Sequence, residues 1–231
     1  MHDPAAQHED MTFDFGATAL GASYHGDWML DAENELDHVV RWYGLDGDLA
    51  DSEGDPTGLL LLIEDVLRLR ESHLQGEELN VLWRATDQPL GGSPEIRGRE
   101  RAWLDELLSV VVPFAQTLGA SPASCATYPA CVPDGTSPAA AEHRQRTAEV
   151  VDLVALLNQQ GNDPIPLPDM RAALVRCAET VCSELAFRFL LRAMQRYRMP
   201  LTPQIYTRLE TLGSAFGYGP HVVDEIANLV E

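Results

Sequence analysis

The chain contains no lysine. Its 16 basic residues are all arginines, and against 36 aspartates and glutamates they give a formal net charge of −20 over 231 residues. A protein that binds DNA or RNA directly needs a basic surface to displace the counterions of the phosphates, so this composition disfavours that class. Attachment to an anionic membrane surface is disfavoured for the same reason.

Long apolar runs are also missing. The longest, such as residues 59–63, have about five residues, whereas a membrane span needs about 20. The sequence has no arginine-rich start followed by an apolar stretch, so no signal peptide is predicted. Together these absences predict a strongly acidic cytoplasmic protein.

Cysteine is scarce. Four cysteines are too few for a disulfide scaffold at this length, and we expect them to be reduced thiols. The five residues between Cys125 and Cys131 make this pair wider than the cysteine pairs of structural zinc sites. If Cys177 and Cys182 lie on one helix, their thiols point about 140° apart, an objection that a helix break near Ser183 would weaken. We therefore expect small buried or loop thiols and no metal.

Motifs of catalysis and of cofactor binding are absent as well. The seven histidines show no H-E-x-x-H or H-x-E spacing, and there is no G-x-S-x-G, P-loop or G-x-G-x-x-G motif. A calcium loop that starts at Asp46 fails, because Ala50 and Asp51 occupy its fifth and sixth positions and Thr57 its twelfth. The sequence supports no enzyme class and no cofactor.

Alternating β-branched patterns are scarce, whereas helix patterns recur. Three helix starts show a capping residue followed by proline: Asp55-Pro56, Ser137-Pro138 and Thr202-Pro203. Apolar periodicity predicts helices over residues 56–70, 101–118, 148–157 and 183–197. Within the second of these, Pro113 is expected to mark a kink or a break. We predict an all-α protein.

The charge divides the chain into two parts. Residues 1–113 hold 24 acids and 7 arginines, whereas residues 114–231 hold 12 acids and 9 arginines. Residues 119–138 are rich in proline, serine, glycine and alanine, which is typical of a linker. A second break, over residues 160–169, has three prolines in five residues and is predicted to stay extended. We therefore predict two helical modules, residues 1–118 and 139–231, joined by a linker over residues 119–138.

A stripe of arginines runs along the predicted helix 183–197. Arg188, Arg192 and Arg196 repeat at the spacing of one helix face, apart from the apolar positions. We expect this face to be solvated. The alternative is that the stripe docks against the acidic N-terminal half of the same chain.

The densest charge lies between residues 27 and 55, a segment that contains ten acids and a single arginine, Arg41. Such a segment is either a solvated surface that keeps the protein soluble or a docking surface for a basic partner. A surface that mimics DNA would use the same physics. The candidate partner-binding residues are the acids Asp27, Asp31, Glu33, Glu35, Asp46, Asp48, Asp51, Glu53 and Asp55, with Trp28 and Trp42 as candidate anchors.

The most distinctive local string is Tyr24-His25-Gly26-Asp27-Trp28. One interpretation is that Tyr24 and Trp28 anchor the first helix to the core, while His25 and Asp27 cap the turn. The other is that a partly exposed tryptophan beside the acidic cluster anchors an interface.

Three segments of the N-terminal half carry a family resemblance: LGASYHGDW at 20–28, the acidic residues 31–37, and VVRWY at 39–43. On these segments, residues 15–112 resemble the CdiI-type immunity proteins of bacterial contact-dependent growth inhibition systems. That family often shows an aromatic residue, a histidine, any residue, an aspartate and a tryptophan ahead of an acidic and apolar helix. This chain has Gly26 where a larger polar residue is expected.

A second resemblance concerns the C-terminal module. It is carried by Glu184-Leu185-Ala186, then residues 197–202, then Tyr206, Leu209, Leu212-Gly213 and Phe216-Gly217. This pattern of helix, proline turn and helix is similar to MafI-type immunity proteins, although the arginine stripe replaces acidic positions.

Both resemblances imply a non-catalytic protein that binds and blocks a cognate toxin. Such toxins are frequently nucleases with a positively charged substrate groove. The acidic composition, taken independently, favours a basic protein partner. The alternative class is an acidic helical adaptor, or a DNA-mimic regulator of a host protein. Charge does not separate the two classes, but a toxin gene immediately upstream would favour immunity.

Overall fold

The computed structural model describes residues 13–45, 57–87, 92, 94–117, 138–219 and 221–231, without the side chains of residues 57 and 138–145. These residues are mostly helical and contain no strand or sheet, which confirms the predicted all-α class. Near the end of the chain, Leu201 and Val230 form an isolated parallel bridge.

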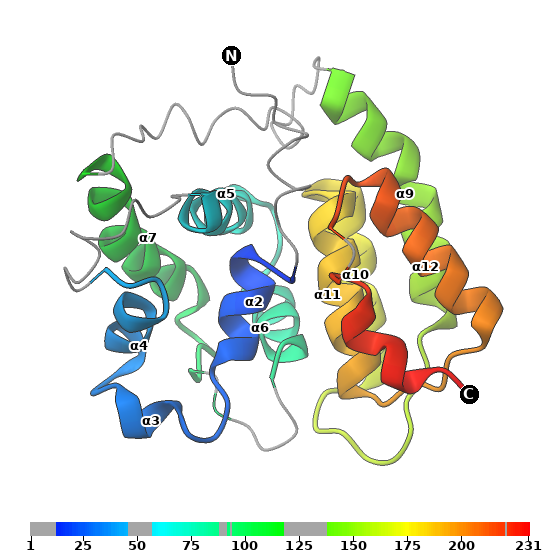
Figure 1. Cartoon of the computed structure of the whole chain (residues 1–231), viewed down its shortest axis with the longest axis horizontal. Coiled ribbons are helices and arrows are strands. Elements are labelled where there is room, and N and C mark those ends of the chain that lie inside the picture. Colours follow the sequence, from blue (N-terminus) through cyan, green and yellow to red (C-terminus); the bar gives the residue numbers. More distant parts are fainter. Residues whose placement is uncertain (1–12, 46–56, 88–91, 93, 118–137, 220) are drawn as a thin grey trace. The chain divides into compact units, whose positions relative to one another are not determined.

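The chain divides into two compact units, whose helices are shown in Figure 1. The N-terminal unit comprises Phe15–Tyr128, and the C-terminal unit comprises Met1–Asp14 together with Pro129–Glu231. The ring of Phe13 stacks on His221, with 5.5 Å between centroids. The prediction that residues 1–118 form one module is therefore wrong at its start, because Phe13 and Asp14 belong with the C-terminal helices. The predicted linker lies outside the described residues except at Pro138, where a helix begins.

The N-terminal unit is built around one apolar helix. Its helices are α2 (Gly16–Ser23), α3 (Trp28–Asp31), α4 (Glu35–Trp42), α5 (Thr57–Glu71), α6 (Gly76–Ala85) and α7 (Glu100–Thr117). α5 packs against α2 and α7, and α7 also packs against α4 and α6. Buried Leu62 and Val66 show why the apolar run of α5 forms a central helix. α7 continues past Pro113 to Thr117, so this proline does not end the helix.

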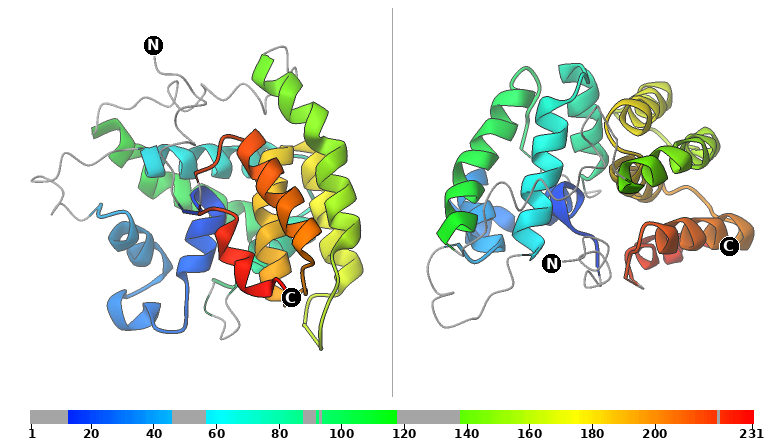
Figure 2. Two further views of the ribbon diagram at one scale, coloured as in Figure 1. Left: turned by 45° about the vertical axis from the view of Figure 1, so that its right-hand side comes forward. Right: turned by 90° about the horizontal axis from the view of Figure 1, so that it is seen from above.

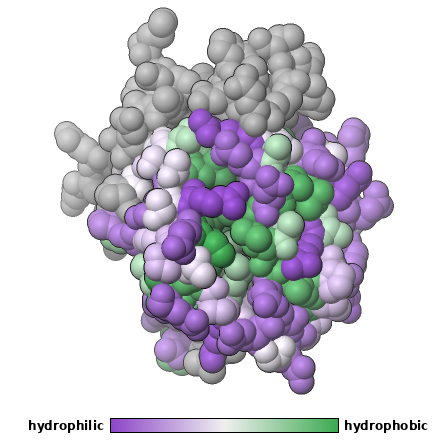
Figure 3. Space-filling model, turned by 90° about the vertical axis from the view of Figure 1, so that its right-hand side faces the viewer, coloured by the Kyte–Doolittle hydropathy of each residue, from purple (hydrophilic) through white to green (hydrophobic). Residues whose placement is uncertain are grey.

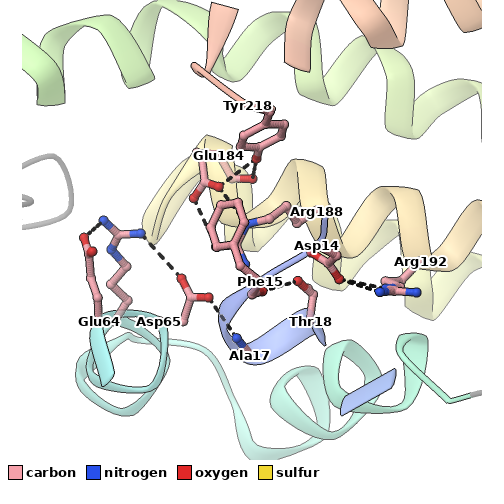
Figure 4. Close-up of polar contacts among 11 residues, drawn as sticks. Asp14, Phe15, Ala17, Thr18, Glu64, Asp65, Glu184, Arg188, Arg192 and Tyr218 are labelled. Atoms are coloured by element: carbon pink, nitrogen blue, oxygen red, sulfur yellow. Dashed lines mark hydrogen bonds and ion pairs between the residues drawn. The ribbon is translucent and has the colours of Figure 1, made fainter. Parts of the chain in front are cut away.

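The start of α2 is capped from a distant helix. Its N-cap residue, Phe15, makes no side-chain capping hydrogen bond. Instead, the carboxylate of Asp65 on α5 accepts a hydrogen bond of 2.9 Å from the backbone N–H of Ala17 (Figure 4). A carboxylate at this place satisfies an otherwise unpaired N–H group and complements the helix dipole.

The C-terminal unit contains α9 (Pro138–Leu156), α10 (Leu167–Thr180), α11 (Ser183–Arg196), α12 (Pro203–Ala215) and the 3₁₀ helix η3 (Asp224–Leu229). α9, α10 and α11 pack against one another in pairs, and η3 packs on α11 (Figure 2). Thr202 Oγ1 accepts a hydrogen bond from the backbone N–H of Ile205, which confirms the predicted cap. The extended break predicted over residues 160–169 is wrong at its end. α10 already begins at Leu167, because a helix tolerates Pro168 in its first turn.

The arginine stripe of α11 is not solvated, because Arg188 and Arg192 are buried and Arg196 is half-buried. Each arginine pairs with a carboxylate of the C-terminal unit: Arg188 with Glu184 at 2.7 Å, Arg192 with Asp14 and Glu225 at 2.6 Å each, and Arg196 with Asp163 at 2.9 Å. Figure 4 shows Arg188 with Glu184 and Arg192 with Asp14. The prediction of a solvated face is wrong, because carboxylates inside the unit compensate these charges. Glu184 lies one turn away on α11, whereas the partners of Arg192 and Arg196 are distant in sequence.

Candidate protein-docking surface

Aromatic rings and a histidine pack together where α2, α3 and α4 meet. His38 of α4 lies 4.5 Å from Tyr24 and 5.6 Å from Trp28, measured between ring centroids. Its Nε2 lies 2.8 Å from Oγ of Ser23 at the end of α2. Burial lowers the pKa of His38 and so favours its neutral imidazole. These contacts join the three helices.

Trp28 belongs to this buried cluster. Its side chain is 7% exposed, and its Nε1–H donates a 2.8 Å hydrogen bond to the carbonyl of Gly92. The prediction of Trp28 as an exposed anchor is therefore wrong. The interpretation that Tyr24 and Trp28 anchor the first helix to the core is confirmed, because both rings are buried and contact each other. Asp27 is the N-cap residue of α3, but its side chain makes no capping hydrogen bond.

Three large apolar side chains of α3 and α4 point outward instead. Met29 is 65% exposed, Leu30 is 82% exposed and Trp42 is 51% exposed. They account for three of the five large apolar side chains that are exposed among the described residues. α3 and α4 pack against each other. We call Met29, Leu30 and Trp42 the α3–α4 patch.

Sequence reasoning found one member of the α3–α4 patch and missed two. Trp42 was a candidate anchor because it follows the acidic residues, and its ring is exposed while it stacks on His38 at 6.0 Å. Met29 and Leu30 were missed, because apolar residues beside a tryptophan are ordinarily assigned to the core. Consecutive residues of a helix are about 100° apart, so burial of Trp28 turns its two neighbours away.

Acidic side chains flank the α3–α4 patch. Asp27, Asp31 and Glu33 are exposed and take part in no ion pair within the described part of the chain. Glu35, in the first turn of α4, is half-buried. Five predicted partner-binding acids lie outside the described residues: Asp46, Asp48, Asp51, Glu53 and Asp55.

Asp37 has a different role from these acids. It accepts hydrogen bonds of 2.9 Å from the backbone N–H of Glu33 and from Nε of Arg41. The backbone hydrogen bond and then the arginine hold the pKa of the Asp37 carboxyl below its usual value. Asp37 thus pairs with Arg41, which is the only arginine between residues 27 and 55.

The two glycines of the 20–28 motif differ in what surrounds them. A Cβ at Gly21 would lie 2.0 Å from Oγ1 and 2.7 Å from Cβ of Thr86, whereas a Cβ at Gly26 would meet nothing within 4 Å. We expect Gly21→Ala to lower the free energy of unfolding by about 1–3 kcal/mol, because the side chain overfills a tight helix contact. Gly26→Ala is the control and is expected to stay within about 0.5 kcal/mol. Urea unfolding measures both, and equal midpoints would contradict this difference.

A charged cluster in the C-terminal unit joins three of its parts. Arg192 of α11 binds Asp14 from the start of the unit and Glu225 from η3. Burial and the nearby charge of Asp14 raise the pKa of Glu225 to about 7, against the attraction of Arg192. Burial lowers the pKa of Arg192, but the two carboxylates outweigh burial and leave it raised. The cluster thus brings the start of the unit, α11 and η3 into contact.

The C-terminal unit also has a hollow of about 240 Å³ between α9 and α12. Figure 3 shows apolar surface between hydrophilic side chains on one face of the protein. The lining residues are Glu149, Leu153, Thr207, Arg208, Thr211 and Leu212. One acid and one arginine balance each other on this hollow, so its charge favours no particular partner.

The described residues offer no metal site. Among them, no group of three or more His, Cys, Asp or Glu side chains is arranged to hold a metal ion. Cys177 lies in α10 and Cys182 precedes α11, and both are buried thiols. Cys125 and Cys131 lie outside the described residues. No helix in the described ranges combines the length and the apolar character that crossing a membrane requires.

Comparison with known proteins found no family model, no curated protein and no solved structure that matches this chain. The function is therefore inferred from the chemistry of its own surface. Among the surfaces described above, the α3–α4 patch is the one where exposed apolar side chains lie beside acidic side chains that have no ion-pair partner in the described part of the chain.

Proposed function

We propose that this chain is a non-catalytic, cytoplasmic immunity protein that binds and neutralises a cognate bacterial toxin. The observation that carries the proposal is the exposed α3–α4 patch beside exposed Asp27, Asp31 and Glu33. Exposed apolar side chains that gather on adjacent helices are typical of protein-binding surfaces. The fixed negative charges favour a basic partner. The resemblance of residues 15–112 to immunity proteins of contact-dependent growth inhibition supports the same class.

Neutralisation by this surface needs no chemical step. A toxin that cleaves nucleic acid carries positive charge where its substrate binds. An acidic protein that docks there excludes the substrate by occupying the same groove. The acidic side chains would speed the encounter, and buried apolar side chains would slow dissociation.

Co-expression tests the proposal. The protein is produced together with the C-terminal domain encoded by the neighbouring gene, and both growth and co-purification are scored. We expect growth to be rescued and a salt-sensitive complex to form. A toxic, well-expressed neighbour that is neither rescued nor bound would overturn the proposal and favour the adaptor class.

The acidic side chains are expected to control the rate of association. The double variant Asp31→Asn/Glu33→Gln should slow association with the toxin domain roughly 3- to 10-fold at low salt, because it removes two charges that attract the partner. The difference should shrink toward 1 M salt, where the Debye length is about 3 Å. Stopped-flow mixing over a salt series measures this.

A control variant separates local charge from net charge. Glu179→Gln/Glu210→Gln removes the same charge from exposed positions of the C-terminal unit. We expect it to change the association rate much less. Equal slowing by both pairs would assign the effect to net charge and remove the α3–α4 acids from the interface.

A further inference from the structure

We infer that the α3–α4 patch binds a positively charged amphipathic helix of the partner. The inference rests on the proposed function, and it adds which kind of element on the toxin is recognised. It is carried by the exposure of Leu30, by the hydrogen bonds that fix α3 and α4 beneath the patch, and by the acidic side chains that flank it.

The exposure of Leu30 favours a helix as the occupant of the α3–α4 patch. Leu30 is 82% exposed on a helix of a single turn, so its side chain protrudes from the surface. A protruding side chain is covered only by a surface that offers a recess. The ridges of side chains on an α-helix leave grooves between them, and such grooves accept single side chains from a crossing helix. Met29 and Trp42 supply apolar area beside Leu30.

The residues beneath the patch hold it in place before any partner arrives. The indole N–H of Trp28 is bound to the carbonyl of Gly92, and the hydroxyl of Tyr24 donates to the carbonyl of Glu35 at 2.9 Å. The side chain of Asn34 caps α4 by accepting hydrogen bonds from the N–H groups of its first turn. Because α3 and α4 are fixed from the buried side, covering their outer face costs little ordering entropy.

The flanking acidic side chains determine which sign of charge the bound helix must carry. Asp27, Asp31 and Glu33 are all exposed, and among the described residues none has an ion-pair partner. A helix whose apolar face covers the patch would place its flanks against these carboxylates. Lysine or arginine on those flanks forms favourable contacts, whereas aspartate or glutamate is repelled. An amphipathic helix with a basic polar face therefore fits this surface.

Two synthetic helical peptides test the inference without the toxin. They have the same length and lysine content, and one carries leucine at the apolar positions where the other carries serine. Trp42 provides the readout, because it is 51% exposed while Trp28, Trp83 and Trp103 are 7%, 2% and 0% exposed. We expect the leucine peptide to shift the fluorescence emission of Trp42 and to bind at least about tenfold more tightly than the serine peptide.

Two leucine variants locate the site. Leu30→Ser is expected to remove most of the preference for the leucine peptide, and because this side chain is exposed the variant should keep the wild-type unfolding midpoint. Leu156→Ser on α9 is the matched control and should keep the preference, since Leu156 is also exposed but belongs to the other unit.

Equal affinity for the two peptides, or an unchanged preference in Leu30→Ser, would overturn the inference. Because the peptides replace the toxin, that result would leave the proposed immunity function standing. Peptide binding as expected, together with failure of the co-expression rescue, would instead support the helix-binding surface and remove the immunity function.

Discussion

Replacing Arg188 by methionine is expected to lower the free energy of unfolding by about 3–5 kcal/mol, because it leaves the buried carboxylate of Glu184 without its cation. Arg188 is 1% exposed and Glu184 is 0% exposed, with Nε and Oε1 separated by 2.7 Å. The hydroxyl of Tyr218 donates a 2.7 Å hydrogen bond to the same carboxylate, but a hydroxyl does not neutralise it (Figure 4).

Denaturant unfolding of a double-mutant cycle measures this effect. Glu184→Gln/Arg188→Met should recover part of the loss of the single Arg188→Met variant, because the double variant buries no charge. Arg208→Met on the exposed face of α12 is the control and should stay within about 0.5 kcal/mol. A loss in Arg188→Met no larger than in Arg208→Met would show that the buried pair contributes little to stability.

Glu225→Gln is expected to stabilise the protein in mildly alkaline solution and to have little effect in acid. The pKa of Glu225 is raised from 4.5 to about 7 in the folded protein, by burial and by the charge of Asp14. Between these values the folded state holds a proton that the unfolded chain releases, so this group makes stability fall as the pH rises from about 4.5 to about 7. The loss is at most about 3 kcal/mol.

Thermal unfolding at a series of pH values checks this expectation. The glutamine resembles the protonated acid, so the midpoint of Glu225→Gln should match that of the wild type near pH 4 and exceed it at pH 8. Glu210→Gln, at an exposed position of α12, should show no such trend. A Glu225→Gln variant that is less stable at pH 8 than the wild type would show that the ionised carboxylate stabilises the cluster.

Features of the fold that depend on residues close together in the sequence could be predicted. The apolar runs of α5 and α11, and the threonine and proline that begin α12, are local patterns, and all three helices lie where they were expected. The specific partner of Arg192 could not be predicted, because Arg192 meets Asp14 across 178 residues of sequence. The cap of Ala17 by Asp65 was missed for the same reason.

The candidate site was predictable in its charge and less so in its apolar part. Acidic side chains ordinarily stay in water, so exposed Asp27, Asp31 and Glu33 follow from their residue type alone. Which apolar side chains stay outside depends on which of them the fold buries. The side chain of Trp28 is buried and donates a hydrogen bond to the carbonyl of Gly92, 64 residues away in the sequence. Leu30, on the same helix, therefore stays exposed to solvent.

The division of the chain at Phe15 has a consequence for how the protein is made. Phe13 and Asp14 belong to the same unit as Pro129–Glu231, so the N-terminal unit is an insertion between two parts of the other. During synthesis, Phe15–Tyr128 is complete and free to fold while the C-terminal helices are still untranslated. The contact between Asp14 and Arg192 forms only after the ribosome has released α11. Asp14, although it is translated early, thus makes its native contact only late in folding.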